Sequence, residues 1–365
     1  MNRLKRIYLV LIGFLLVILS PQPLKAQNGP SFTMDKGTNI SHWLSQSQRR
    51  GAERSAFFTE KDVRYLAGLG FDHIRIPVDE EQLWTEDGKK VREAFALLHN
   101  GIQWSRRAGL NVIVDLHILR SHHFNEGERP LWVDPQEQER FLQCWKDLSE
   151  ELKKYPNALV AYELMNEPVA DDPEDWNKLI AKGVEVIRKN EPQRTIIIGS
   201  NLWNKPQTFV DLRVPEDDPN FILSFHMYEP MLITHYKASW TKTRDFEGEV
   251  NYPGTIVSED ERNKLSGELA QLVREQDLFY DKVTIEHHFG KAIARAQELN
   301  LPLHCGEWGV YPTVSDEIRF AWYKDVLEVL HKYDIAWSTW DYKGGFGIIR
   351  GGEEDKELIQ ILVGK

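Results

Sequence analysis

Short apolar runs alternate with longer amphipathic stretches along most of this chain. Most of the apolar runs are continuous and rich in Val, Ile and Phe, which is typical of strands buried on both faces. Eight runs are predicted as strands: Gly37–Trp43, Phe71–Val78, Asn111–His117, Leu159–Leu164, Arg194–Gly199, Phe221–His226, Pro302–Glu307 and Ala336–Trp340. Helical spacing is found over Val91–Ala108, Gln136–Lys154, Glu174–Lys189, Ile285–Leu299, Ser315–Tyr333 and Glu354–Val363. Thr59 and Asp62 have the spacing of a capping box, so another helix is predicted to start there.

This alternation predicts a (β/α)8 TIM barrel. A doubly wound sheet is the competing fold, but no glycine-rich phosphate loop accompanies the strands. The interval between the sixth strand and the helix at Ile285 is too long for an ordinary connection. Residues 229–282 are therefore predicted to form a lid or subdomain insertion over the barrel mouth, partly helical around Glu259–Asp281.

The N-terminus has the layout of a secretory signal peptide. Basic residues precede an apolar run over Ile7–Leu19, and a small residue, Ala26, follows. The run is short for a transmembrane helix, so we expect cleavage after residue 26 and no stable membrane insertion. Residues 27–365 are then one catalytic domain, exported to the periplasm or outside the cell.

Composition narrows the class of partner. The net charge of −11 argues against nucleic acid, which needs clustered Lys and Arg. Twelve Trp, 12 Tyr and 16 Phe suit a site that stacks sugar rings, although each could equally belong to a large core. The two cysteines, Cys144 and Cys305, are expected to be buried free thiols. We expect a monomer.

Candidate chemistry gathers at the carboxyl ends of the predicted strands, where a barrel of this kind places its active site. The residues found there are Asn39, His42, Arg75, His117, Asn166, Glu167, Trp203, His226, Tyr228, Glu307 and Trp340. Polar side chains that terminate apolar strands are costly to bury without partners. Their convergence from separate strands therefore favours a functional site over isolated structural residues.

Glu167 and Glu307 end the fourth and seventh strands, so a barrel would bring them to one mouth. Glycosidic cleavage uses such a pair, one to protonate the leaving oxygen and one to attack or activate water. Arg75 beside Glu307 would keep that carboxylate ionised as nucleophile, and Tyr228 could hold it. Glu167 would be the acid/base. Two unrelated glutamates, on the surface or in salt bridges, are the alternative interpretation.

Two other residues have expected roles at the sugar. Asn166 could donate to a sugar 2-hydroxyl, and Trp340 could stack under the ring being cleaved. Each also has a structural interpretation, as a turn residue and a core residue. His117 and His226 end strands, but no HxH or HExxH spacing occurs, so we expect hydrogen-bonding histidines and no metal site.

The chain resembles glycoside hydrolase family 5, the cellulase family of clan A. The matching segments follow the family's order from residue 37 to 343: Gly37-Thr-Asn-Ile-Ser, Phe71 to Pro77, Val114-Asp-Leu-His117, Asn166-Glu-Pro168, His226-Met-Tyr228, Gly306-Glu-Trp308 and the Trp340 strand. Cues such as Lys237-Ala-Ser-Trp240 and Tyr252-Pro-Gly254 resemble the endoglucanase C type, in which a helical subdomain follows strand six. The resemblance implies a (β/α)8 barrel, retention of anomeric configuration, no cofactor and β-1,4-glucan as substrate.

The family's eight active-site residue types then correspond to Arg75, His117, Asn166, Glu167, His226, Tyr228, Glu307 and Trp340. One position departs: many members have a second His after the strand-three His, where this chain has Ile118. A sugar contact could be missing there or be supplied by His122 or His123.

Three functions are left open by the sequence. The first is a retaining endo-β-1,4-glucanase acting on a β-glucan polysaccharide or oligosaccharide. The second keeps the chemistry but changes the sugar or the mode: a β-mannanase, a mixed-linkage or β-1,3-glucanase, or an exo-β-glucosidase. The third is a non-catalytic glycan-binding barrel, against which the retained glutamate pair argues.

Overall fold

The computed structural model describes residues 31–216, 218–276 and 279–364. The predicted signal peptide, residues 1–26, lies outside the described residues. None of the helices within the described ranges is both long and apolar enough to cross a membrane.

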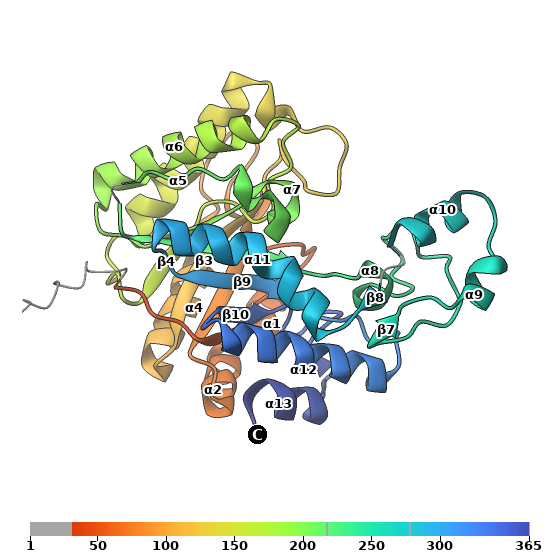
Figure 1. Cartoon of the computed structure of the whole chain (residues 1–365). Coiled ribbons are helices and arrows are strands. Elements are labelled where there is room, and N and C mark those ends of the chain that lie inside the picture. The colour runs from red at the N-terminus through yellow and green to blue at the C-terminus, as the bar shows by residue number, and fades with distance from the viewer. Residues whose placement is uncertain (1–30, 217, 277–278, 365) are drawn as a thin grey trace, which may run out of the picture.

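A closed barrel of eight parallel strands forms the centre of the molecule and confirms the predicted fold (Figure 1). Going round the barrel, the strands are β1 (Lys36–Asn39), β2 (His73–Asp79), β3 (Asn111–Ile118), β4 (Val160–Glu163), β5 (Ile196–Gly199), β6 (Phe221–Met227), β9 (Leu303–Trp308) and β10 (Ala336–Thr339). Each of the eight predicted runs contributes one strand, but several strands are shorter than predicted. The first ends at Asn39 rather than Trp43, because a turn with His42 at φ 57° follows it.

Helices surround the barrel, and the longer ones lie where the amphipathic stretches predict them, while the short helices at 51–57 and 80–83 were not predicted. The surrounding helices are α1 (Gly51–Phe57), α2 (Glu60–Leu69), α3 (Glu80–Leu83), α4 (Arg92–Ala108), α5 (Pro135–Leu152) preceded by η1 (Pro130–Trp132), α6 (Pro173–Asn190), α11 (Lys282–Leu299), α12 (Asp316–Lys332) and α13 (Lys356–Val363). The Thr59–Asp62 capping box opens α2 as predicted. A short hairpin, β11 (Ile349–Arg350) with β12 (Glu353–Glu354), precedes α13.

The connection after β5 departs from the strand–helix repeat. Only α7 (Asn201–Asn204) and the 3-10 turn η2 (Pro206–Val210) stand where a full helix would be, and η2 packs against α11. Leu202 and Trp203 have left-handed backbone angles, which interrupt the helix. Pro206 then fixes the start of a new turn.

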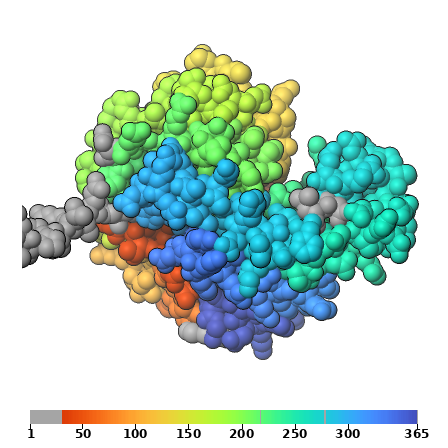
Figure 2. All heavy atoms as spheres, in the orientation of Figure 1, coloured from red at the N-terminus to blue at the C-terminus, as the bar shows by residue number. Residues whose placement is uncertain are grey.

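The segment between β6 and α11 forms a small unit that projects to one side of the barrel (Figure 1). It contains α8 (Met231–Thr234), α9 (Glu259–Asn263), α10 (Gly267–Gln276) and the antiparallel pair β7 (Gly254–Thr255) and β8 (Phe279–Tyr280). Its buried side chains continue the main core, including Phe246, Tyr252, Ile256 and Val273. The predicted partial helicity is therefore present, while the role of a lid stays a prediction. In the space-filling view the surface is hollowed between this unit and the upper lobe of the barrel (Figure 2).

The barrel interior is layered. Ile113, Ala161, Ile197 and Ile222 form an apolar layer near the start of their strands, with Phe32 packed against it. Asp115 and Glu163 lie nearer the carboxyl ends of β3 and β4, and Arg75, the third residue of β2, reaches Glu163 with its guanidinium; all three side chains are fully buried. Both cysteines are buried free thiols, as predicted. The apolar layer closes the barrel at the amino ends of the strands. A ligand can therefore reach the buried polar groups only from the carboxyl ends.

Candidate active site

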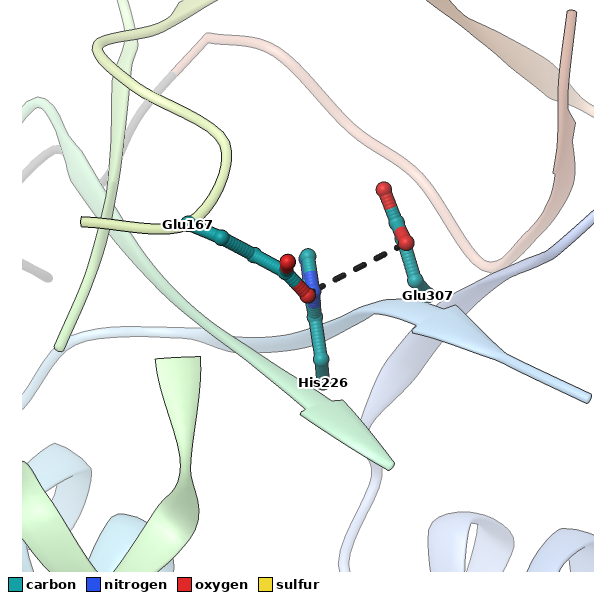
Figure 3. Close-up of side chains that lie close together, drawn as sticks. All are labelled: Glu167, His226 and Glu307. Carbon is teal, nitrogen blue, oxygen red and sulfur yellow. Dashed lines mark hydrogen bonds and ion pairs between the residues drawn. The ribbon is translucent and has the colours of Figure 1, made fainter. Parts of the chain in front are cut away.

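Glu167 and Glu307 approach one another at the carboxyl end of the barrel. Glu167 follows the end of β4, and Glu307 lies in β9; their exposed fractions are 7% and 4%. One carboxyl oxygen of each and one ring nitrogen of His226 all lie within 4.8 Å of one another (Figure 3). Carboxyl groups this close suit direct attack on the anomeric carbon, because an intervening water needs roughly 6.5–9.5 Å between them.

A bulge in the barrel wall sets the register of this cluster. The pairing of β6 with β9 shifts between Phe225 and His226, so that His226 lies opposite Glu307. Gly306 is the residue skipped by the shift, and a Cβ there would lie 2.7 Å from Ser224 Oγ. Bulges often re-aim side chains at active sites, and a side chain at position 306 would press on Ser224 and on the His226 ring, so glycine leaves that ring in place.

Glu307 receives two hydrogen bonds that favour its ionised form. Arg75 Nη1 donates to Oε1 at 2.8 Å, and the hydroxyl of Tyr228 donates to Oε2 at 3.0 Å. Burial raises the pKa of Glu307, while the Arg75 guanidinium and the Tyr228 bond oppose that rise. The sequence predicted both contacts, and the structure places both.

Arg75 is held by more partners than the sequence indicated. Its Nε and Nη2 donate to the two oxygens of Glu163 at 2.6 and 3.1 Å, and Nη2 lies 3.0 Å from Asp115 Oδ2. Burial raises the pKa of Asp115 and of Glu163 to about 7. The surrounding carboxylates raise the pKa of Arg75 despite its burial, so the guanidinium stays charged.

Sequence reasoning missed Asp115 and Glu163 as parts of the site. Both occur within apolar strands, Asp115 in the middle of one run and Glu163 near the end of another. An acidic residue inside a buried strand must be paired, and that was the available signal.

Glu167 has the surroundings of an acid. His226 Nδ1 lies 2.8 Å from its Oε1. Burial and the neighbouring charge of Glu307 raise the pKa of Glu167 well above its usual range. Burial lowers the pKa of His226, so the ring is neutral and does not pull the proton from Glu167. Of the two carboxyl groups, Glu167 is therefore the one whose surroundings favour the protonated form, while Arg75 and Tyr228 favour the ionised form of Glu307.

Asn166, His117 and Trp340 line the same end of the barrel. Asn166 Oδ1 accepts from Arg75 at 2.8 Å, and its Nδ2 is buried without a partner among the described residues. His117 bonds Asp115 through Nδ1 at 2.6 Å and stacks on Trp340 with ring centroids 5.5 Å apart. Burial lowers the pKa of His117 to about 3. The free amide donor of Asn166 suits a sugar hydroxyl, as the sequence predicted.

Two of the predicted supporting residues, Asn39 and Trp203, do not lie beside the carboxyl pair as sugar contacts. Asn39 contacts Arg75 at 2.7 Å through Oδ1, and its Nδ2 donates to the carbonyl oxygens of Gly306 and Thr339. It ties β1 to β9 and β10 and positions Arg75, so we assign it no sugar contact. Trp203 is 36% exposed, and its indole N–H donates to the carbonyl of Phe124 at 3.0 Å. It belongs to the rim beyond the carboxyl pair.

The expected replacement for the absent second histidine is not His122. Its ring is buried, and Nε2 lies 2.9 Å from the carbonyl oxygen of Glu167. Burial lowers the pKa of His122 to about 4, so the neutral ring fixes the backbone at Glu167. His123 is partly exposed and packs on Phe124.

The same cluster contains the residue types that bind metal ions. Within the described ranges, Glu167, His226 and Glu307 are the one set of acidic, His and Cys groups close enough to share an ion. Arg75 already places a positive charge 2.8 Å from Glu307, and His226 Nδ1 is engaged with Glu167. A second cation would meet the guanidinium at close range, so these donors fit an acid–nucleophile pair better than a metal.

The molecule is a (β/α)8 barrel with two carboxyl groups close together at its mouth, one in surroundings that favour its proton and one held by a guanidinium and a hydroxyl. This combination defines a glycoside hydrolase. The family model "Cellulase (glycosyl hydrolase family 5)" matches residues 35–345. The chain therefore belongs to glycoside hydrolase family 5.

Known proteins agree with that assignment. Endoglucanase C of Acetivibrio thermocellus is 31% identical over 336 residues, covering 89% of this chain and 97% of that protein. Cellodextrinase A of Ruminococcus flavefaciens is 30% identical over 305 residues, covering 82% and 83%. Among solved structures, Cel5A of Thermotoga maritima in complex with cellobiose has a TM-score of 0.72 at 24% identity, covering 90% of this chain and 97% of that one. At that identity, the structural likeness supports the fold alone.

Proposed function

We propose that this protein is a retaining endo-β-1,4-glucanase, with Glu167 as acid/base and Glu307 as nucleophile. The observation that carries the proposal is the approach of the two carboxyl groups to within 4.8 Å, together with their different surroundings. Similarity to endoglucanase C over most of both chains supports the β-1,4-glucan preference.

In the first step, Glu167 gives its proton to the glycosidic oxygen while a carboxylate oxygen of Glu307 bonds to the anomeric carbon. The bond from that carbon to the leaving oxygen breaks, and the released chain end departs with a new hydroxyl. Arg75 and Tyr228 hold Glu307 in place, and they neutralise its charge before attack. Asn166 Nδ2 donates to the 2-hydroxyl as positive charge develops on the ring.

In the second step, water attacks the same carbon from the side of the departed group. Glu167, now ionised, takes the proton of that water, and the bond to Glu307 breaks. The anomeric configuration is restored by the second inversion. Loss of the covalent bond returns the negative charge to Glu307 beside Arg75, and the next cycle starts from the same protonation state.

Stereochemistry is the most direct test of this mechanism. ¹H NMR of early products from a cello-oligosaccharide should show the β-anomer first. Early accumulation of the α-anomer would mean inversion and would rule out a covalent intermediate. Glu307→Ala should remove hydrolysis, and substantial remaining activity would eliminate Glu307 as nucleophile.

Substrate choice is tested separately from mechanism. Carboxymethylcellulose, lichenan, laminarin, glucomannan and mannan should be compared at matched concentrations, with cello-oligosaccharides to separate internal from terminal cleavage. We expect internal cleavage of β-1,4-glucan to be fastest. Faster cleavage of mannan, or release of glucose alone from chain ends, would overturn the endoglucanase proposal while leaving the catalytic pair intact.

We also propose that the protein is exported after removal of residues 1–26. The support is the order of basic residues, apolar run and small residue in the sequence. N-terminal sequencing of the mature protein from the producing cells should begin at Gln27. A chain that retains Met1 would contradict export by this route, and size-exclusion chromatography of the same sample would test the expected monomer.

A further inference from the structure

Asn204 lies behind the acid/base side of the site, and neither the mechanism nor the sequence motifs use it. Its Nδ2 is hydrogen-bonded to the carbonyl oxygen of Asn166 and lies 3.4 Å from His226 Nε2. The other ring nitrogen of His226, Nδ1, lies 2.8 Å from Glu167 Oε1. Asn204, His226 and Glu167 therefore form one hydrogen-bonded chain from the turn after β5 to the reacting atoms.

The chemistry of the partners settles the orientation of the Asn204 amide. A carbonyl oxygen can only accept, so the nitrogen of the amide must be the atom that faces Asn166. The second hydrogen of the same nitrogen is then available to His226 Nε2. A ring nitrogen that accepts a hydrogen bond has no hydrogen of its own, so the proton of the neutral ring lies on Nδ1.

The local backbone is shaped around this side chain. Leu202, Trp203 and Asn204 have φ values of 54°, 63° and 54°, a left-handed conformation that Asn tolerates better than most residues. A Cβ on Gly199 would lie 2.1 Å from Asn204 Oδ1 and 2.4 Å from Nδ2. The end of β5 must therefore be glycine for the amide to lie where it does.

We propose that Asn204 is a positioning residue that fixes the tautomer of His226 and thereby decides which oxygen of Glu167 carries the acid proton. With the ring proton on Nδ1, His226 donates to Oε1, so the proton of the neutral carboxyl group lies on Oε2. That oxygen is free to protonate the leaving group. In the opposite tautomer, Nδ1 would accept the Glu167 proton and hold it away from the substrate.

The hydrogen bond from His226 Nδ1 to Glu167 also affects the pKa of Glu167, and therefore the pH dependence of activity. Donation from His226 Nδ1 favours ionised Glu167, which the second step needs as a base, and so limits the rise in pKa caused by burial. Loss of the donor should raise the pKa of Glu167 further. Among the described residues, the other charged or titratable groups that act on Glu167 and His226 include Glu307, Arg75, Asp115, Lys205, Tyr228, His117 and His304. None of these is altered by the changes tested below.

Two variants distinguish the effect of the His226 tautomer from the effect of an added negative charge. In Asn204→Asp the side chain can only accept, so Nε2 should become the protonated nitrogen. Gly199→Ala displaces the amide without adding charge and serves if Asn204→Asp folds poorly. Asn201→Asp is the matched control, because the Asn201 amide lies in the same turn but bonds the backbone of Ala170.

The tautomer is read without substrate, from ¹⁵N-histidine NMR of the full chain, with the His226 signals assigned through His226→Gln. We expect Nδ1–H in the native protein and in the control, and a switch to Nε2–H in Asn204→Asp. A native ring protonated on Nε2, or no switch in that variant, would refute the proposal.

Activity then tests the link to Glu167, which rests on the proposed function. For Gly199→Ala we expect the alkaline limb of the kcat/KM profile to move to higher pH. We also expect at least a tenfold loss on substrates with poor leaving groups and a smaller loss on activated aryl glycosides. An unmoved alkaline limb, or equal losses on both substrates, would show that Asn204 does not act through the acid proton. If the native protein cleaved no β-glucan, the proposed function would fail while the NMR result would still stand.

Discussion

Tyr228→Phe isolates the hydrogen bond that the tyrosine hydroxyl gives to Glu307. The change removes one oxygen atom, at 3.0 Å from Glu307 Oε2, and keeps the ring that packs on His235 and Phe346. A hydrogen bond to a buried charge contributes about 1.5–3 kcal/mol. One pKa unit corresponds to about 1.4 kcal/mol, so the pKa of Glu307 should rise by about 1–2 units.

The expected result follows from the sign of that shift. Glu307 must be ionised to attack, so a higher pKa moves the acid limb of the kcat/KM profile to higher pH. On the acid side, kcat/KM should fall by about 10- to 100-fold, with a smaller loss at alkaline pH where Arg75 alone keeps Glu307 ionised. The assay is initial rates on an aryl β-cellobioside over the full pH range.

Tyr236→Phe is the control for that experiment. It removes a hydroxyl that donates to the carbonyl of Gly248 at 2.8 Å, within the insertion and away from Glu307. Its acid limb should coincide with that of the native enzyme. An unmoved acid limb in Tyr228→Phe would refute the assignment of Tyr228 as the residue that holds the nucleophile ionised.

Three other perturbations follow from the same contacts. Arg75→Met leaves buried carboxylates without their cation and should lower the free energy of unfolding by about 3–5 kcal/mol at neutral pH. Because burial raises the pKa of Glu163 to about 7, the folded state binds more protons than the unfolded one; stability should recover as pH falls toward the unfolded pKa, and urea unfolding curves that do not depend on pH would contradict this. Asn166→Ala should lower kcat by at least about tenfold on a glucoside but little on the 2-deoxy analogue, and equal losses would exclude the 2-hydroxyl contact. Thr59→Ala removes one half of the capping box and should cost about 1 kcal/mol in urea unfolding with unchanged kcat/KM; an activity loss would mean that α2 reaches the site.

The repeated alternation of buried strands and amphipathic helices was determined by the sequence alone. Continuous apolar runs and helical spacing depend on local patterns, so the eight strands and most helices could be located from them. Strand ends were less well determined, because an apolar turn such as Ile40–Trp43 reads like a strand. The interrupted helix after β5 could not be foreseen, since Leu202 and Trp203 carry no glycine or proline signal for a left-handed backbone.

The candidate site was determined in part by residue type at strand ends. Glu167, Glu307, Arg75 and Tyr228 were identified in this way because carboxylates and their partners are costly to bury unless they meet. Only the tertiary structure decided which of these side chains are in contact. It placed Asn39 against Arg75, gave Arg75 two further carboxylates, turned His122 toward the Glu167 backbone and set Asn204 behind His226. These contacts join residues far apart in the chain, and their distances depend on barrel closure, a bulge and the packing of neighbouring side chains, which no local pattern encodes.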